Sequence, residues 1–235
     1  MNVRVNRYGQ PIGPTMTDWS SRPRPSRIQL AGRYCRLEPV NPQRHGAELY
    51  AAYMDAPDDR DWTYLLDERP EREEDFDSYL TKLASSEDPL HFTIIESYSK
   101  KALGTVALVR IEPVHGSIEV GGITFSPRLQ RTAAGTESMY LLMQLAFDEL
   151  GYRRYEWKCD SLNAPSRAAA ERYGFTFEGI FRNALVYKGR SRDTAWYSIT
   201  DREWPRVRSA LEAWLDPANF DEHGRQKRRL QDLRS

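Results

Sequence analysis

The hydrophobic residues of this 235-residue chain follow two periods, and the longest run with the helical period lies near the middle of the sequence. Apolar residues there recur at positions i, i+3, i+4, i+7, i+8 and i+11, on one face of a helix. They are Met139, Leu142, Met143, Ala146, Phe147 and Leu150. An apolar segment over residues 118–125 precedes them, followed by Pro127 and a run of small and hydroxyl residues. This pattern predicts a strand, a loop and an amphipathic helix.

Further elements are predicted on both sides of this unit from the same two periods. Helices are expected over residues 42–54, 75–85, 163–173 and 202–215. Asn163 is the expected N-cap of the third of these helices, and Gly174 its stop. Strands are expected over residues 33–39, 91–98, 103–111, 154–159, 175–181 and 194–200, with a basic loop between the last two. This order of elements predicts an α/β fold without an internal repeat.

Composition fits one such domain with an extension at each end. The chain is 40% hydrophobic and 11% aromatic, which suits a single core better than two. Residues 1–30 contain four prolines and are expected to form an extended N-terminal arm. The domain is expected over residues 31–215, and residues 216–235 form a polar C-terminal tail that we expect to be frayed.

Charge and cysteine content narrow the functional class. Lysine plus arginine equals aspartate plus glutamate at 34 each, so no overall field favours nucleic acid or a membrane surface. No apolar run reaches membrane-spanning length, and the N-terminus lacks the apolar core of a signal peptide. Cys35 and Cys159 are expected to be buried free thiols, and the four histidines show no metal-ligand spacing. We expect a cytoplasmic protein without a metal.

Residues 55–77 carry an uneven share of the charge. Eleven acidic residues and three basic ones give this segment a net charge of about −8, interrupted by an aromatic pair, Trp62 and Tyr64. One interpretation is a solvated face. The other is a wall that attracts a cationic substrate and packs its apolar part against the two aromatic rings.

The loop before the central helix has the sequence Leu-Gln-Arg-Thr-Ala-Ala-Gly-Thr-Glu over residues 129–137. Small residues allow close backbone approach, and the free N–H groups at a helix N-terminus attract phosphate. The loop is neither of the common nucleotide-binding glycine motifs. It resembles the Q/R-x-x-G-x-G/A loop of the GNAT N-acetyltransferases, with Ala133 in place of the first glycine, and the run from Arg131 looks most like the RimJ/RimL-type branch.

Two shorter motifs extend the resemblance to about residues 32–215. Asn163-x-x-Ser166 is similar to the N-x-x-S of that branch, and Gly174-Phe175 to the G-F that ends the helix. The resemblance implies the GNAT fold, a mixed, mostly antiparallel sheet with splayed central strands flanked by helices. It also implies acetyl-CoA as cosubstrate. The implied cofactor-binding residues are Phe125, Gln130, Arg131, Thr132, Ala133, Ala134, Gly135, Thr136, Asn163 and Ser166.

The expected catalytic pair is Glu119 and Ser166. Acetyl transfer needs a neutral amine, and an amine with a pKa near 10 is mostly protonated at pH 7, so a base is useful. Strand alternation places Glu119 opposite Ile118 and Val120, eleven residues before Gln130, a spacing similar to that of the glutamate base in several GNAT enzymes. The alternative role for Glu119 is an ion-pair member. Many GNAT proteins carry a tyrosine acid where this chain has Ala170, so Ser166, Tyr173 or water is left to protonate the thiolate.

These observations predict an acetyl-CoA-dependent N-acetyltransferase working by direct attack of a primary amine in a ternary complex. The acceptor is expected to be a small cationic amine that meets Trp62, Tyr64 and Glu119. Two alternatives stay open, a protein N-terminal acetyltransferase of the RimJ/RimL type and a non-catalytic acyl-CoA-binding sensor. No nucleic-acid or membrane partner is expected, and the sequence leaves open whether the chain forms a homodimer.

Overall fold

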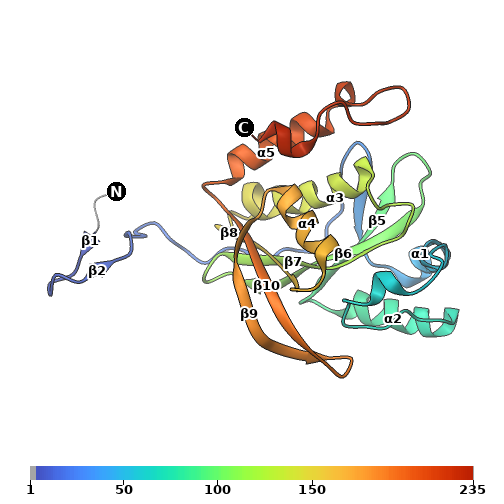
Figure 1. The fold of residues 1–235 in the computed structure, drawn as a ribbon, viewed down its shortest axis with the longest axis horizontal. Helices are drawn as coiled ribbons and strands as arrows, with labels where there is room; N and C mark the ends of the chain where they lie inside the picture. The colour runs from blue at the N-terminus through green and yellow to red at the C-terminus, as the bar shows by residue number, and fades with distance from the viewer. Residues whose placement is uncertain (1–3, 235) are drawn as a thin grey trace.

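The computed structural model describes residues 4–234, and residues 1–3 and 235 lie outside the described part. One mixed sheet forms its centre (Figure 1). Its strands are β3 (Leu30–Ala31), β4 (Cys35–Pro39), β5 (Leu90–Glu96), β6 (Ala102–Glu112), β7 (Ser117–Phe125), β8 (Arg154–Asp160), β9 (Thr176–Tyr187) and β10 (Arg190–Thr200). They are arranged in the order β3-β4-β5-β6-β7-β8-β10-β9. A separate pair, β1 (Arg4–Val5) and β2 (Pro11–Ile12), lies in the N-terminal arm.

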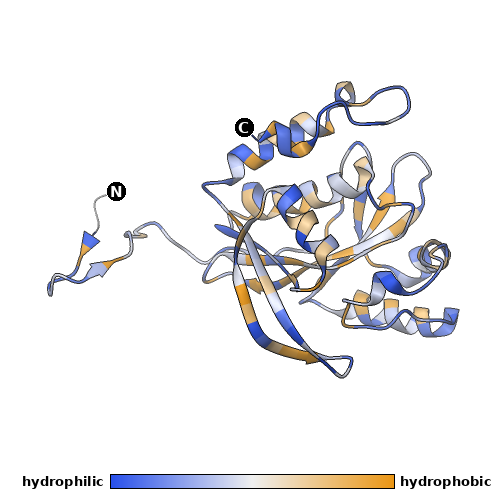
Figure 2. Ribbon diagram, in the orientation of Figure 1, coloured by the Kyte–Doolittle hydropathy of each residue, from blue (hydrophilic) through white to orange (hydrophobic). Residues whose placement is uncertain are grey.

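Helices cover both faces of this sheet (Figure 1). They are α1 (Pro42–Met54), α2 (Glu73–Ser85), α3 (Ala133–Gln144), α4 (Ala164–Tyr173) and α5 (Trp204–Leu215). One apolar cluster joins α3, α4 and α5 to the sheet, and a second lies between α1, α2 and the opposite face. Figure 2 shows the hydrophobic residues concentrated along the strands and on parts of the helices. Among the described residues, every helix is too short or too polar to cross a membrane.

Helix ends follow the sequence signals closely. Asn41 caps α1 by accepting a hydrogen bond from the Arg44 N–H, and Asn163 caps α4 by accepting one from the Ser166 N–H. Gly174 ends α4 in the left-handed conformation at φ +100°, which a residue with a side chain rarely adopts. The predictions for these two helices are confirmed. The α3 helix continues into a π-helical turn over Leu145–Glu149.

The central strands part, as the resemblance implied. Strands β7 and β8 run parallel and pair only from Ser117 with Arg154 to Val120 with Trp157. Beyond that point the two strands share no residue pairs. Strand β8 pairs along its other edge with β10, antiparallel over seven residue pairs, and β7 pairs along its other edge with β6. The two strands therefore leave a gap between their C-terminal halves, and the GNAT topology is confirmed.

The last hairpin is longer than the sequence pattern predicted. Strands β9 and β10 extend to a turn at Lys188 and Gly189, so Arg190 and Arg192 lie in a strand and not in a loop. Strand β9 is the sheet edge and is exposed along most of its length. The period-two alternation that reveals a half-buried strand is therefore absent there.

The two extensions behave differently. The N-terminal arm extends away from the domain (Figure 1). It is attached to the domain where the Trp19 indole donates a hydrogen bond to the Val114 carbonyl. The expectation of a frayed C-terminal tail is wrong at two places, because short 3-10 turns over Pro217–Asn219 and Leu230–Leu233 pack against the domain. Leu230 is fully buried. Too few apolar residues mark this tail for periodicity to reveal it.

A buried carboxylate ties the first strands to the central helix. Glu137 of α3 accepts hydrogen bonds from the backbone N–H groups of Arg33, Tyr34 and Cys35, at 2.8, 2.6 and 2.8 Å. A Cβ at Gly32 would lie 2.4 Å from the Glu137 carboxyl carbon, so glycine is required for this approach. Three donors at the β3–β4 turn thus depend on one side chain.

We predict that Glu137→Ala lowers the free energy of unfolding by about 3 kcal/mol, because it leaves these N–H groups without their acceptor. Urea denaturation measures the loss. The control is Glu149→Ala, an exposed residue with no hydrogen bond or ion pair among residues 4–234, which we expect to change stability by less than about 0.5 kcal/mol. Equal effects in the two variants would contradict the assigned role of Glu137.

Candidate active site

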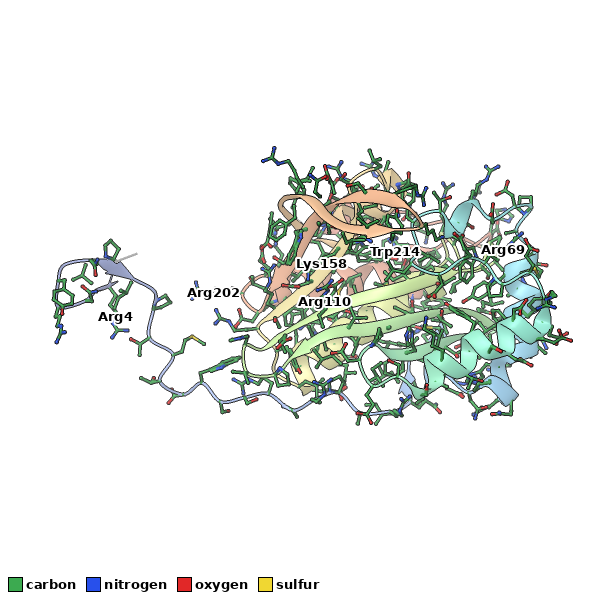
Figure 3. All side chains as sticks on the ribbon, turned by 90° about the horizontal axis from the view of Figure 1, so that it is seen from below. Arg4, Arg69, Arg110, Lys158, Arg202 and Trp214 are labelled. Atoms are coloured by element: carbon green, nitrogen blue, oxygen red, sulfur yellow. The ribbon has the colours of Figure 1, made fainter. Side chains whose placement is uncertain are left out.

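A cavity of about 1850 Å³ passes through the gap between β7 and β8. Its lining comes from the segment between α1 and α2, from β5, β7 and β8, from the starts of α3 and α4, and from the β9–β10 hairpin. Figure 3 shows two of its residues, Arg110 and Lys158, on the sheet face beside this hairpin. The volume exceeds the range usual for a single small ligand, so there is room for two substrates.

The predicted cofactor loop lies at one end of this cavity, at the start of α3. The Thr132 hydroxyl caps the helix by accepting a hydrogen bond from the Gly135 N–H. Within residues 4–234, the N–H groups of Ala133 and Ala134 have no acceptor. The cavity is lined by Phe125 and by Gln130, Arg131, Thr132, Ala133, Gly135 and Thr136. Ala134 is the exception, because its side chain is buried in the core and contributes at most its N–H group.

Gly135 serves the loop's own packing. A Cβ at this position would lie 2.8 Å from the Leu129 carbonyl oxygen and 3.2 Å from the Phe125 ring. A larger residue would therefore displace the loop from α3, whatever it did to a ligand. Ala133, at the first position of the helix and half-buried, is the better position for a test of anion binding.

Arg172 of α4 adds a cation near this helix N-terminus, and the sequence reasoning missed it. Its guanidinium donates a hydrogen bond to the Thr136 hydroxyl at 3.2 Å and lies 4.8 Å from the centre of the Trp214 ring. Residues of the C-terminal tail, including Phe220 and Gln226, line the same region. No sequence signal points to these contacts, because they join segments that are distant along the chain.

Asn163 and Ser166 lie where β8 leads into α4. The Asn163 side-chain oxygen is used in the cap, and the Ser166 hydroxyl accepts a hydrogen bond from the Trp157 indole at 3.0 Å. Because the Ser166 oxygen is the acceptor in this bond, the hydroxyl keeps its own proton. Tyr173 is buried and packs beside Trp157, in agreement with its interpretation as a core aromatic. Both cysteines are buried free thiols, as expected, and burial raises the pKa of Cys159.

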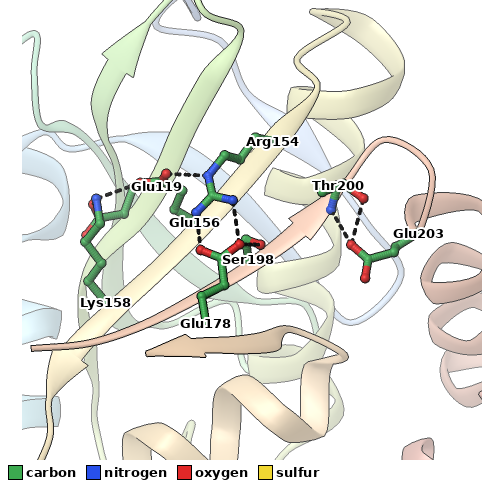
Figure 4. A network of polar contacts seen from close by, with 8 residues as sticks. All are labelled: Glu119, Arg154, Glu156, Lys158, Glu178, Ser198, Thr200 and Glu203. Carbon is green, nitrogen blue, oxygen red and sulfur yellow. Dashed lines mark hydrogen bonds and ion pairs between the residues drawn. The ribbon is translucent and has the colours of Figure 1, made fainter. Parts of the chain in front are cut away.

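Glu119 combines the two roles that the sequence left open. It lines the cavity one residue before the last β7–β8 pair, and it is buried. Its carboxylate lies 2.8 Å from the Lys158 ammonium (Figure 4). It also lies 3.1 Å from the Arg110 guanidinium. Burial raises the pKa of Glu119 above its ordinary value despite the nearby Lys158 and Arg110. The residue is thus an ion-pair member whose basicity is increased by its surroundings.

The acidic segment forms part of the cavity wall through several tethers. Gln130 donates a hydrogen bond to Asp61, and the Tyr64 hydroxyl donates one to the Leu162 carbonyl. Lys188 and Arg190 of the hairpin donate to the carbonyls of residues 62 and 63. The segment is thereby fixed to the cofactor loop, to the start of α4 and to the hairpin.

The two aromatics of this segment differ in their surroundings. Trp62 is only 3% exposed and packs edge to face against Tyr53 and Tyr79, so it is chiefly a core residue. Trp62 nevertheless lines the cavity, so its contact with the substrate stays a prediction. Tyr64 is half-buried and lines the cavity, as a substrate-contacting residue must.

Most of the segment's negative charge faces away from the cavity. Of its eleven acidic residues, only Asp61 and Asp67 are part of the lining. Asp55, Asp58 and Asp75 form ion pairs with arginines, Glu68 pairs with Lys188, and Asp67 pairs with Lys82. The solvated-face interpretation therefore holds for most of the segment, and the wall interpretation is reduced to two carboxylates.

His91 of β5 is a further lining residue that the sequence did not single out. Its side chain is buried, and its Nδ1 has no hydrogen-bond partner within the described residues. Burial lowers its pKa to about 4, so the imidazole is neutral at pH 7. No group of three or more potential metal ligands occurs in the described part of the chain.

Comparison with known proteins identifies the family. Residues 35–176 match the family described as "Acetyltransferase (GNAT) domain", and the chain belongs to this family. The fold is similar to that of a GCN5-related N-acetyltransferase from Brucella melitensis, with 49% identity, a TM-score of 0.92, and 93% of this chain and 99% of that chain covered. It also resembles a probable GNAT acetyltransferase from Chromobacterium violaceum, with 39% identity, a TM-score of 0.77 and 83% and 98% covered.

A curated relative bears on the branch. The "Putative ribosomal N-acetyltransferase YdaF" of Bacillus subtilis is 30% identical over 107 residues, which are 46% of this chain and 58% of that protein. The chain thus spans little more than half the length of this relative. The fold also matches RimL, a ribosomal L7/L12 alpha-N-protein acetyltransferase, at 20% identity and a TM-score of 0.62. The match to RimL concerns the fold alone, and the resemblance to the RimJ/RimL-like branch, inferred from the loop sequence, is consistent with the name of the YdaF relative.

GNAT proteins use acetyl-CoA, and the residues of this site suit that molecule. Free N–H groups at the start of α3 and the cations Arg131 and Arg172 match the negative charge of a pyrophosphate and a ribose phosphate. The gap between β7 and β8 is open on the Asn163 side for an extended chain carrying a thioester.

We predict that Ala133→Asp weakens acetyl-CoA binding at least tenfold, about 1.4 kcal/mol, because it places a carboxylate where the phosphates would bind. An acidic residue in the first turn favours the helix, so the fold should be retained. Titration calorimetry measures the change. The control is Ala168→Asp on the exposed part of α4, which adds the same charge away from the cavity. Unchanged affinity in the Ala133→Asp protein would exclude this loop as the phosphate site.

Proposed function

We propose that the protein transfers an acetyl group from acetyl-CoA to a primary amine by direct attack in a ternary complex. The observation that carries this proposal is the position of Glu119, a buried carboxylate in the cavity wall beside the point where β7 and β8 part. The cofactor loop approaches this point from the α3 side. Glu119 belongs to the opposite face, because its neighbours Ile118 and Val120 are in the core cluster beneath α3.

The reaction assigned to these residues is a direct acyl transfer. The amine nitrogen forms a bond to the thioester carbonyl carbon, and the bond from that carbon to sulfur breaks. The nitrogen gives up a proton to the Glu119 carboxylate, directly or through one water. The departing thiolate takes a proton from the Ser166 hydroxyl or from water. Ser166 suits this role because the Trp157 indole donates to its oxygen and stabilises negative charge that develops there.

A buried base suits an amine acceptor. An amine with a pKa near 10 enters mostly as the ammonium ion and must lose a proton before it attacks. A carboxylate whose pKa is raised by burial takes that proton more readily than an exposed one. The acceptor remains a small cationic amine in this proposal, attracted by Glu119 together with Asp61 and Asp67.

A second candidate is acetylation of a protein N-terminus. It is favoured by the names of the YdaF and RimL relatives, which refer to ribosomal proteins. The exposed apolar side chains of Leu66, Phe181 and Leu162, in three segments that line or border the cavity, would contact a peptide that extends beyond it. Thiol release measured with polyamines, amino sugars, amino acids and peptide N-termini separates the two candidates by the highest specificity constant.

We predict that Glu119→Gln lowers turnover about a hundredfold near neutral pH while acetyl-CoA affinity changes little. The rate should recover at high pH, where the amine loses its proton unaided. Glu149→Gln is the control, because this exposed glutamate lies outside the cavity lining and outside the polar network around Glu119. Normal turnover of Glu119→Gln at pH 7 would refute the base. Binding of acetyl-CoA without turnover of any acceptor by the wild type would favour the sensor.

The cationic acceptor has its own test. Asp67 lines the cavity, where it pairs with Lys82, whereas Asp58 pairs with Arg60 outside it. We expect Asp67→Asn to raise the KM of a cationic acceptor severalfold at low ionic strength, and this difference should shrink as salt shortens the screening length to about 8 Å at 0.15 M. Asp58→Asn should leave KM unchanged. A preference for anionic acceptors, or equal effects of the two substitutions, would return the whole segment to the solvated-face interpretation.

A further inference from the structure

Lys158 of β8 occupies an unusual position for a lysine, buried between two carboxylates. Its ammonium lies 2.8 Å from Glu119 and 2.6 Å from Glu156 (Figure 4). The centre of the Trp196 ring is 3.8 Å from the same ammonium. Its side chain is 6% exposed, and those of Glu119 and Glu156 are 8% and 13% exposed. Lysine is seldom buried to this extent unless it is paired.

The sheet register explains why a cation is needed here. Glu119 on β7 and Glu156 on β8 are direct partners in the parallel pair, so their side chains project side by side from one face. Two carboxylates so close in a buried site would repel each other, and one would take up a proton. Lys158, two residues further along β8, projects from the same face and neutralises both.

The other charged group facing Glu119 is much more exposed. Arg110 from β6 contacts the same carboxylate oxygen at 3.1 Å, but its side chain is 63% exposed and water screens its charge. From β10 the neighbour is the neutral ring of Trp196. The charged groups that act on the pKa of Glu119 are thus Lys158, Arg110 and Glu156, and Lys158 is the buried cation among them.

The partner carboxylate is itself held in place. Arg154 lies 2.6 Å from Glu156 and also binds Glu178, which accepts a hydrogen bond from the Ser198 hydroxyl (Figure 4). Because Glu156 is fixed, it keeps a constant share of the lysine's charge. Glu119 therefore shares Lys158 with Glu156 and does not have a lysine of its own.

We infer that Lys158 is the positioning residue of the reaction, which holds Glu119 ionised and directed into the cavity, and that Glu156 limits this effect by sharing the lysine. The inference rests on the proposed role of Glu119 as base. Lys158 touches neither substrate in this assignment. Its action is confined to the charge and orientation of Glu119.

The test is the pH dependence of kcat/KM with the best amine acceptor from the panel. The acid limb of this profile reports the ionisation of the base in the free enzyme. We expect Lys158→Met to move this limb to higher pH by about one unit or more, because burial and Glu156 then act on Glu119 unopposed by the lysine. Lys158→Arg should largely restore the limb. Glu156→Gln should move the acid limb to lower pH, because Lys158 then pairs with Glu119 alone.

Two controls make the outcome specific. Acetyl-CoA affinity by calorimetry should stay within about twofold in all these variants, and Arg110→Met should shift the limb less than Lys158→Met because its charge is screened. An unchanged limb in Lys158→Met, in a protein where Glu119→Gln abolishes turnover, would overturn the inference and leave the base in place. If Lys158→Met does not fold, an acid limb in Glu156→Gln that fails to move down overturns it as well. Unchanged activity of the Glu119→Gln protein would instead overturn the proposed function.

Discussion

The short parallel pairing of β7 and β8 is the constraint on which the rest of the structure depends. Backbone groups that leave a sheet must find other partners, because a buried N–H or C=O without one is costly. Beyond Trp157, β8 pairs on its β10 side alone, and beyond Val120, β7 pairs on its β6 side alone. The gap therefore exposes one edge of each strand to the cavity. The N-terminus of α3 and Glu119 both line the cavity at this gap.

The electrostatic field in the cavity depends on which charged side chains line it and on whether they are already paired. The acidic segment has a large formal charge, yet internal ion pairs with arginine and lysine neutralise much of it, and two of its carboxylates line the cavity. Glu119, in contrast, is a single carboxylate with a buried neighbourhood, where each nearby charge counts for more than it would in water. A few buried groups consequently influence the site more than the longest run of charge in the sequence.

Sequence reasoning succeeded where the signal is local. Asn41, Asn163 and Gly174 act through residues three or four positions away, so the ends of α1 and α4 were predictable. It failed where the partner is distant. The burial of Trp62 depends on Tyr53 and Tyr79 in two different helices. The ion pair of Lys158 is formed with a glutamate 39 residues away.

The candidate site divides along the same line. The loop motif and the Asn163-x-x-Ser166 spacing are contiguous in sequence, and the structure brings both to one cavity. His91, Arg172 and the tail residue Gln226 reach that cavity through folding of separate segments, and no spacing rule connects them. Strand alternation placed Glu119 on its face but carried no information about which cation it would meet.

The arrangement of β10 beside β8 also has a consequence for the order in which the protein can be completed during its synthesis. Strand β8 shares four residue pairs with β7, which precedes it, and seven with β10, which follows it after α4 and β9. Growing chains tend to fold from the N-terminus, so a nascent chain that has emerged as far as α4 holds β8 by its weaker partner. One wall of the cavity is thus completed only after the residues up to 200 have been synthesised.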